Sequence, residues 1–346
     1  MRDVYDRYFA AVSVADAARA VEVVDDALFR GAPPADLITD VLVRAQSTVG
    51  EKWQRGEWTV ADEHAATAVA KRALTVVSPP GPASDGARHV VVACAEGEWH
   101  SLPARMAGEL LRGQGLQVTM LGASTPADQL RRQLRSSDPD VLALSATMTT
   151  SLIGAADGIA AARAEGVPVV VGGNAWGEGQ RRARALGAHL RLVDIRDVRH
   201  RLDELRGTTA PPLPVLPDEA RWLAVVPQDV VTAAVGARNR ADHPRAVTDR
   251  AARAEAEREL ACIGRHAAAA VACDDPSVLA DHLDWLSTVR EAHGRPATPT
   301  LASALRLAEA VEEQAPRGAA VLRAEVEAAR RRHHLPRRTT ASGASA

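Results

Sequence analysis

One loop of this 346-residue sequence combines an acid and an imidazole at the end of a predicted strand. Glu98 and His100 stand two residues apart, just after the apolar run 89–95. An imidazole in such a loop can bind a metal ion through one ring nitrogen while a carboxylate holds the other. The same histidine can equally be a solvated loop side chain, so its role depends on what surrounds it.

Small residues end the neighbouring apolar runs. Ser145 and Thr147 follow one run, and Gly172 and Gly173 follow the next. Side chains this short leave a slot beside the sheet through which a bulky group can pass. Tight packing of helix on strand would explain either pair by itself.

A second group of chemically capable residues lies nearer the start of the chain. The sequence has only six Trp, two Tyr and two Phe, yet Trp53 and Trp58 are five residues apart, and Glu63 and His64 follow. An indole can shield a reactive bond from water while an acid and an imidazole hold a polar ligand. The alternative is that both indoles fill a helical core, and we expect this of Trp58.

The elements that position the loop residues form an α/β domain, predicted for residues 88–207. Short runs rich in β-branched residues alternate there with helical stretches. This alternation predicts a Rossmann-like fold with a parallel sheet. Ligands of such sheets bind beyond the carboxyl ends of the strands, where Glu98, His100, Ser145 and Gly172 are expected.

Helices are expected on both sides of this domain. Residues 1–80 read as a four-helix bundle, with Thr59 as an N-cap supported by Asp62, and residues 78–87 read as a linker. A Pro-rich linker, 208–220, leads into a helical domain over 218–335. The tail 336–346 is expected to be disordered.

Composition excludes several classes of protein. The net charge is −2, so no global basic field attracts nucleic acid or membranes. The three cysteines suit neither a disulfide framework nor a zinc site by their spacing. With no signal peptide and no apolar run long enough to span a membrane, we expect a cytoplasmic protein.

Taken in order, the strand-end residues resemble the cobalamin-binding domain. That family has Asp-x-His-x-x-Gly, then Ser-x-Leu, then Gly-Gly. Here Glu98 replaces the Asp, Pro103 the Gly and Thr147 the Leu, whereas His100, Ser145 and Gly172-Gly173 match. The resemblance implies that His100 is the lower axial ligand of cobalt, that Glu98 orients it, and that the nucleotide tail lies in the slot.

Trp53, nine residues and then Glu63-His64 resemble the cap of light-sensing cobalamin proteins of the CarH type. The resemblance implies adenosylcobalamin as cofactor, with Trp53 over the adenosyl group. Those proteins carry a helix-turn-helix domain ahead of the bundle. Since none precedes it here, direct binding of nucleic acid is not expected.

With its C-terminal helices the chain resembles the photocobilins, whose globin-like domain binds biliverdin. An open tetrapyrrole needs cations for its propionates, acceptors for its pyrrole N–H groups and an apolar slot. The candidates here are Arg250, Arg253, Arg258, His266, His282 and Trp285, with Arg245 and Arg265 nearby. The arginines could instead form a solvated face. His266 could bind haem, and Cys262 or Cys273 could attach a bilin or be buried thiols.

The sequence therefore predicts a non-enzymatic light sensor. Light breaks the cobalt–carbon bond, directly or through the bilin, and the conformational change passes to an unidentified protein effector; a homodimer is plausible. One alternative is a corrinoid methyl carrier or a component of an adenosylcobalamin-dependent enzyme. Another is a cobalamin-only sensor whose C-terminal helices bind a protein.

Overall fold

The computed structural model describes residues 1–77, 86–194, 196, 198–205, 210–241 and 250–334. The chain divides into two compact units, Met1–Leu216 with Ala272–Asp274, and Pro217–Val271 with Asp275–Ala346. Most of the predicted first linker, part of the second, Arg245 and the predicted tail lie outside the described residues. The division into three domains stays a prediction.

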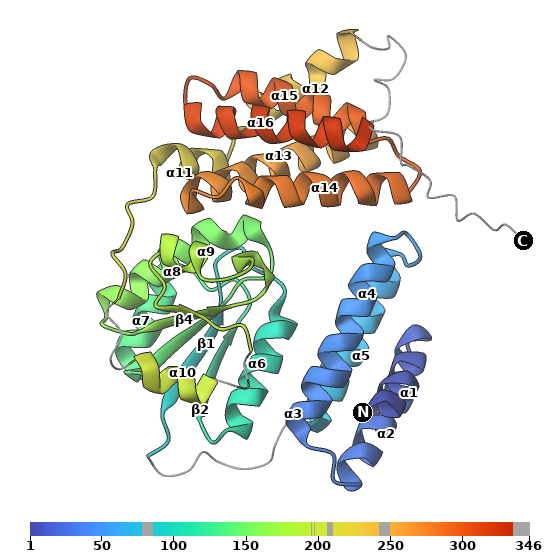
Figure 1. Cartoon of the computed structure of the whole chain (residues 1–346), viewed down its shortest axis with the longest axis vertical. Coiled ribbons are helices and arrows are strands. Elements are labelled where there is room, and N and C mark those ends of the chain that lie inside the picture. The colour runs from blue at the N-terminus through green and yellow to red at the C-terminus, as the bar shows by residue number, and fades with distance from the viewer. Residues whose placement is uncertain (78–85, 195, 197, 206–209, 242–249, 335–346) are drawn as a thin grey trace, which may run out of the picture. The chain divides into compact units, whose positions relative to one another are not determined.

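The first unit begins with helices (Figure 1). They are α1 (Arg2–Ser13), α2 (Ala17–Phe29), α3 (Pro34–Asp36), the π-helix η1 (Leu37–Val43), α4 (Arg44–Gln54) and α5 (Val60–Val77). Thr59 directly precedes α5. Its backbone N–H donates to Asp62 Oδ2 at 2.8 Å, and the Asp62 backbone N–H donates to Thr59 Oγ1 at 3.2 Å. This reciprocal pair is the predicted capping arrangement, and it fixes where α5 begins.

These helices share one apolar core. Tyr8, Leu37, Leu42 and Leu74 are among its fully buried side chains. Trp58 packs against this core and stacks on Phe9, with 6.1 Å between ring centroids. The expectation that Trp58 serves packing is therefore met.

A five-stranded sheet follows, in the order β2-β1-β3-β4-β5, with every pair parallel. Its strands are β1 (His89–Cys94), β2 (Gln117–Gly122), β3 (Val141–Ser145), β4 (Val169–Gly172) and β5 (Leu190–Arg191). The predicted parallel, Rossmann-like sheet is confirmed. The chain order reverses between β1 and β3, which is where ligands of such sheets bind.

Helices cover both faces of the sheet, as right-handed crossovers require. They are α6 (Ser101–Gly113), α7 (Ala127–Ser137), η2 (Thr149–Ser151), α8 (Leu152–Ala164), η3 (Asn174–Trp176), α9 (Arg181–Ala185) and α10 (Val198–Leu205). Helices α6 and α10 share a core with one face of β1, β3 and β4. On the other face, Gly158 of α8 lies against Leu130 of α7 and Leu144 of β3.

Helix α6 has a second apolar face. Leu102, Met106 and Leu110 belong to the core of the N-terminal helices, whereas Ala104 and Leu111 belong to the core of the sheet. One amphipathic helix therefore packs on both layers. Because α6 begins directly after His100, the predicted metal-binding loop is attached to this shared helix.

The second unit is helical. It contains α11 (Asp218–Ala224), α12 (Gln228–Ala241), α13 (Arg250–Cys273) apart from its last two residues, α14 (Ser277–Ala292), α15 (Thr298–Ala310) and α16 (Pro316–His334). Leu260, Ile263, Leu283 and Leu322 are fully buried there. Helix α16 lies against α11, α14 and α15. The globin-like character predicted for this unit stays a prediction.

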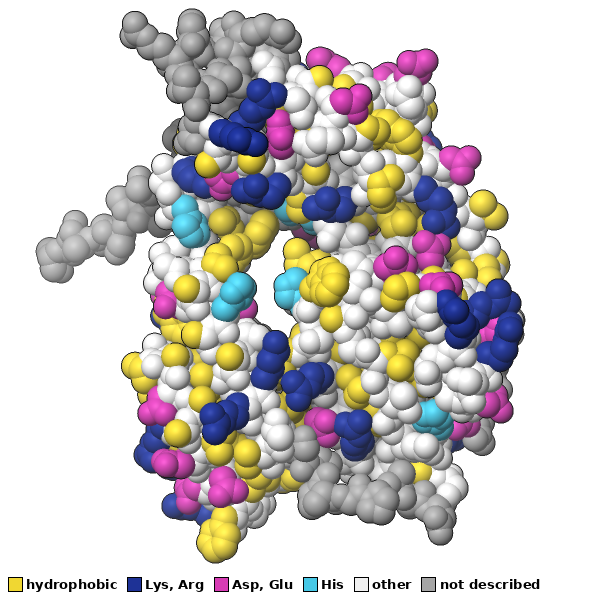
Figure 2. Space-filling model, turned by 180° about the vertical axis from the view of Figure 1, so that it is seen from behind, with side chains coloured by type: hydrophobic (Ala, Val, Ile, Leu, Met, Phe, Trp, Pro, Cys, Tyr) yellow, Lys and Arg dark blue, Asp and Glu magenta, His cyan; other side chains and the backbone are white. Residues whose placement is uncertain are grey.

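Two features concern contact with membranes and with nucleic acid: the character of the helices and the distribution of surface charge. Among the described residues, none of the helices combines the length and the apolar character needed to cross a bilayer. On the face drawn in Figure 2, basic and acidic side chains are interspersed instead of forming one basic patch.

Candidate functional site

The loop after β1 holds Glu98 and His100 in a fixed relation. Glu98 is fully buried, and its Oε1 accepts hydrogen bonds from the His100 backbone N–H at 2.8 Å and from the His100 ring Nδ1 at 2.7 Å. The His100 side chain is 57% exposed. Since Nδ1 is engaged by the carboxylate, the ring offers Nε2 to a ligand, which is the arrangement of an oriented metal-binding histidine.

The other carboxylate oxygen of Glu98 reaches the loop after β3. Its Oε2 accepts from the backbone N–H groups of Thr147 at 2.6 Å and of Met148 at 2.8 Å. Ser151 Oγ lies 3.5 Å away. One buried side chain thus joins two loops at the carboxyl edge of the sheet, on either side of the point where the strand order reverses.

This network sets the protonation of both side chains. Burial by itself would raise the pKa of Glu98, but hydrogen bonds from the His100 ring and from the backbone of Met148, His100 and Thr147 outweigh it and lower the pKa below its ordinary value. The hydrogen bond that the His100 ring donates to Glu98 raises the pKa of His100; burial opposes this, and the charges of Glu98 and Glu63 add to it. Glu98 is therefore held as a carboxylate.

The small residues predicted to leave a slot lie together at the edge of the sheet. Strand register places Cys94 beside Ser145, and Ser145 beside Gly172, so the three strand ends are level. A Cβ built on Gly172 would meet no atom within 4 Å. The hydroxyl of Thr147 is buried and has no hydrogen-bond partner within the protein.

Gly173 serves the backbone instead of the slot. Its φ is +104°, and an added Cβ would lie 2.3 Å from the Ala146 carbonyl oxygen. Only glycine adopts this conformation without strain. The paired glycines therefore have separate functions, one leaving space and the other allowing the chain to turn.

The helical residues predicted to form a cap lie around the start of α5. Glu63 Oε1 accepts from Thr67 Oγ1 at 2.9 Å, and Glu63 Oε2 lies 3.5 Å from His64 Nε2. The His64 side chain is 74% exposed, and Trp53 is half-buried near the end of α4. Because the charge of Glu63 acts on His100, this part of α5 is electrostatically coupled to the loop after β1.

The residues predicted to bind a bilin do not all come together. His266 of α13 and His282 of α14 are buried and stacked, and Trp285 stacks on His282 at 5.7 Å between centroids. Burial lowers the pKa of His266 to about 4. The two imidazoles are therefore partners of each other, and they offer no exposed face to a propionate.

The predicted arginines lie elsewhere on α13. Arg250, Arg253 and Arg258 are exposed, and Arg253 pairs with Glu257 at 3.1 Å. At 1.5 Å of rise per residue, Arg250 lies about 24 Å and Arg258 about 12 Å along the helix from His266. The structure does not assemble these arginines with the histidines into one site.

Several further residues at the carboxyl edge lie in the predicted strand ends but belong to no motif. Thr125, after β2, has a buried hydroxyl without a hydrogen-bond partner within the protein. Ser124 Oγ accepts from the Gly97 N–H at 3.1 Å, and Gly154 lets α8 approach the Glu96 carbonyl. The position of Ser124 and Thr125 just past an apolar run was the available signal. Backbone donors such as Met148 carry none.

The chain matches two families, each described as a B12 binding domain. Residues 88–191 match one, and residues 4–78 match the other. These spans contain the sheet with its carboxyl-edge residues and the N-terminal helices, respectively. The matches support a cobalamin cofactor.

Curated relatives fall into two groups. The HTH-type transcriptional repressor CarH of Myxococcus xanthus is 32% identical over 184 residues, which is 52% of this chain and 61% of that protein. The trimethylamine corrinoid protein of Methanosarcina barkeri is 28% identical over 138 residues, 39% of this chain and 64% of that protein. The chain thus spans less than two thirds of either. Since repressors occur among its relatives, the expectation of no direct nucleic-acid partner is withdrawn.

A solved structure supports the fold. The monomethylamine corrinoid protein of Methanosarcina barkeri covers 59% of this chain with 99% of its own, at a TM-score of 0.52 and 22% identity. This likeness concerns the architecture alone.

The residues present fit a corrinoid. An oriented imidazole with Nε2 available suits a cobalt ligand, since nitrogen of imidazole is a common ligand of first-row transition metals. The open space at Gly172 and the unpartnered hydroxyls of Thr125 and Thr147 suit a bulky polar group in the slot. The carboxyl edge of the sheet thus provides both the imidazole for the metal and the space for the rest of the ligand.

The two glycines provide a first test. We expect Gly172→Ala to leave the free energy of unfolding nearly unchanged and to weaken corrinoid binding, because its methyl group enters open space that the ligand needs. Gly173→Ala should lower the free energy of unfolding by at least about 1–2 kcal/mol, since it forces a left-handed backbone on alanine. Urea unfolding and corrinoid titration followed by absorbance measure both. If Gly172→Ala and the unmodified chain bind corrinoid with equal affinity, the ligand does not occupy the space beside Gly172.

Glu98 provides a second test. Glu98→Gln turns an amide donor toward backbone donors, so we expect a loss of about 1–3 kcal/mol in the free energy of unfolding and weaker corrinoid binding. Glu98→Asp keeps the charge and is the matched control, with a smaller effect on both. If the Gln and Asp variants behave alike in urea unfolding and corrinoid titration, the negative charge of Glu98 is not what holds the loops after β1 and β3 together.

Proposed function

We propose that this protein is a cobalamin-binding regulator that senses light. The observation that carries the proposal is the Glu98–His100 pair at the switch point of the sheet, together with Trp53, Glu63 and His64 at the N-terminal helices. When bound, adenosylcobalamin supplies a cobalt–carbon bond that visible light breaks.

Different residues of the chain would contact the two faces of the corrin. His100 would hold the cobalt through Nε2, and Glu98 would keep the proton on Nδ1 so that the lone pair of Nε2 stays available. Ser145, Thr147 and Gly172 shape the slot for the nucleotide tail, and Gly173 lets the chain turn beside it. The match to B12 binding domains over residues 88–191 supports this assignment.

The N-terminal helices cover the upper face. Trp53 excludes water from the cobalt–carbon bond and packs on the adenosyl group, while Glu63 and His64 hold its polar edge. Trp53 would lose this contact when the adenosyl group leaves, and the packing of α4 and α5 would then change. The relationship to CarH and the match of residues 4–78 to a B12 binding domain support this view.

The signal requires a partner. A protein effector remains the proposed recipient, and the relationship to transcriptional repressors adds nucleic acid to the candidates. The chain acts in this proposal as a regulator without catalysis of its own, in a cytoplasmic setting.

The bilin belongs to the proposal only through the resemblance to photocobilins. The resemblance assigns His266, His282 and Trp285 to biliverdin, but the buried stack of the two imidazoles would have to open to admit it, and the arginines of α13 lie apart from that stack. Mixing the protein with biliverdin should produce a structured red absorption band. If biliverdin remains unbound, the C-terminal helices have another role and the cobalamin part of the proposal is untouched.

The second candidate function is a corrinoid methyl carrier. Its support is the similarity to the trimethylamine corrinoid protein and the fold shared with the monomethylamine corrinoid protein. A carrier must present its upper face to a methyltransferase, so the two candidates differ in what Trp53 does.

The upper face can be tested by selectivity. We expect Trp53→Ala to weaken binding of adenosylcobalamin and to leave methylcobalamin binding nearly unchanged, because only the adenosyl group packs on the indole. Trp58→Ala is the control: it should cost about 1–3 kcal/mol in the free energy of unfolding without altering the preference, since Trp58 packs against the core. A Trp53 variant that retains the full preference for the adenosyl form would favour the carrier.

The response to light needs a readout from the protein, because the free cofactor is itself photolabile. We expect illumination of the adenosylcobalamin-loaded chain to change its elution in size-exclusion chromatography or its protease sensitivity. Protein loaded with hydroxocobalamin should not respond. An identical profile in the dark and after illumination would contradict light sensing.

A further inference from the structure

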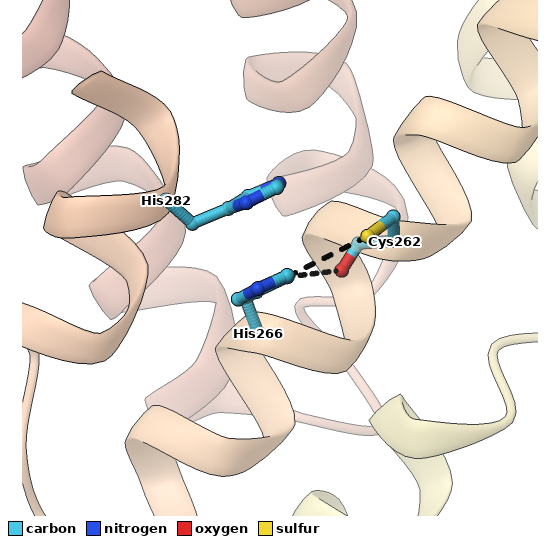
Figure 3. Close-up of side chains that lie close together, drawn as sticks. All are labelled: Cys262, His266 and His282. Atoms are coloured by element: carbon cyan, nitrogen blue, oxygen red, sulfur yellow. Dashed lines mark hydrogen bonds between the residues drawn. The ribbon is translucent and has the colours of Figure 1, made fainter. Parts of the chain in front are cut away.

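A cluster of potential metal ligands lies in the second unit, apart from the residues assigned to cobalamin. Cys262, His266 and His282 each offer one ligand atom, and these atoms all lie within 4.8 Å of one another. Figure 3 shows that Cys262 and His266 come from one helix and that the His282 ring faces the His266 ring. Among the residues that the structure describes, these three form the one group of His, Cys or acidic side chains that lie close enough together to share a metal ion.

Helix geometry explains why the three meet. Cys262 and His266 are four residues apart on α13, so they share one face of the helix. His282 comes from the middle of α14. Two elements therefore fix the set, which is more rigid than a site built on loops.

Hydrogen bonds engage one of the two imidazoles and leave the other free. His266 Nδ1 lies 3.7 Å from Cys262 Sγ and donates to the Cys262 carbonyl oxygen at 2.8 Å, so the ring must release this hydrogen bond, or flip to bring Nε2 toward the sulfur, when it binds an ion. His282 Nε2 is buried and has no hydrogen-bond partner within the protein. His266 is 2% exposed and His282 9% exposed. An unpartnered buried nitrogen is costly, and a bound ion would satisfy it.

The spacing is close to that of a metal site, although the rings must turn. The imidazoles stack with centroids 3.5 Å apart and planes 7° from parallel. At Zn–N of about 2.0–2.1 Å and Zn–S of about 2.3 Å, ligand atoms around a tetrahedral ion lie roughly 3.3–3.8 Å apart. Because the planes are stacked, at least one ring must turn about its side-chain torsions before lone pairs of both rings point at one ion.

We propose that Cys262, His266 and His282 form a Zn²⁺ site, with a water molecule as fourth ligand. One sulfur and two nitrogens suit zinc, and three protein ligands are the number found in zinc sites with an exchangeable position. Binding requires the Cys262 thiol to lose its proton, which passes to the solvent. The site pins α13 to α14, and it is independent of cobalamin.

Metal titration of the full-length, metal-free protein tests this. We expect one Zn²⁺ per chain in competition with a chromophoric zinc indicator. With Co²⁺ as a probe, a thiolate-to-metal charge-transfer band and tetrahedral d–d bands should appear. Cys262→Ser should remove the charge-transfer band, and His282→Gln should weaken binding by at least about tenfold, which is what even an indirect supporting contact contributes at metal sites.

Controls separate this site from others. Cys273→Ser replaces the other cysteine of α13, and His293→Gln replaces a histidine just past α14; both should bind Zn²⁺ as the unmodified chain does. His100→Ala should also bind it normally, so failure of the cobalamin assignment would not affect the result. Circular dichroism checks that each variant is folded, and the near-isosteric Cys262→Ser keeps the test valid if a histidine variant unfolds. Absence of Zn²⁺ binding, or binding unaffected by Cys262→Ser and His282→Gln, would overturn the proposal.

Discussion

The buried carboxylate of Glu98 is the interaction on which the candidate site depends. A fully buried negative charge is costly unless its lone pairs are satisfied, and Glu98 satisfies them with the ring and backbone of His100 and the backbone of Thr147 and Met148. Because its partners belong to two loops, the charge fixes the gap between β1 and β3 at the switch point of the sheet. The orientation of the imidazole is a consequence of the same charge. One side chain thus fixes both the spacing of the two loops and the orientation of the His100 ring.

Helix α6 extends this constraint to the N-terminal helices. It begins at Ser101, directly after the imidazole, and packs one face on the sheet and the other on the N-terminal core. A displacement of the loop is therefore opposed by two apolar cores. The electrostatic effect of Glu63 on His100 runs between the same two layers. Helix α6 is thus an element through which a displacement in one layer can reach the other.

The sequence was sufficient for those features that depend on local pattern. Runs of β-branched residues predicted the parallel sheet, the Thr59–Asp62 spacing predicted the start of α5, and the spacing of Glu98 and His100 predicted their contact. Features that depend on strand register could not be predicted in this way. The Thr147 and Met148 amides lie about fifty residues from Glu98, and a backbone N–H has no signature in a sequence. The arginines of α13 illustrate the opposite error, since helical spacing grouped side chains that the rise of the helix keeps apart.

The central claim is that the Nε2 atom of His100 binds cobalt, and electron paramagnetic resonance tests it most directly. The chain loaded with cobalamin in the Co(II) state is prepared with natural-abundance histidine and with ¹⁵N-labelled histidine. The account predicts that the nitrogen superhyperfine triplet becomes a doublet on labelling and disappears in the His100→Ala variant. A triplet that is unchanged by labelling would mean that the nucleotide base of the cofactor, not the protein, occupies the lower position, and it would contradict the account.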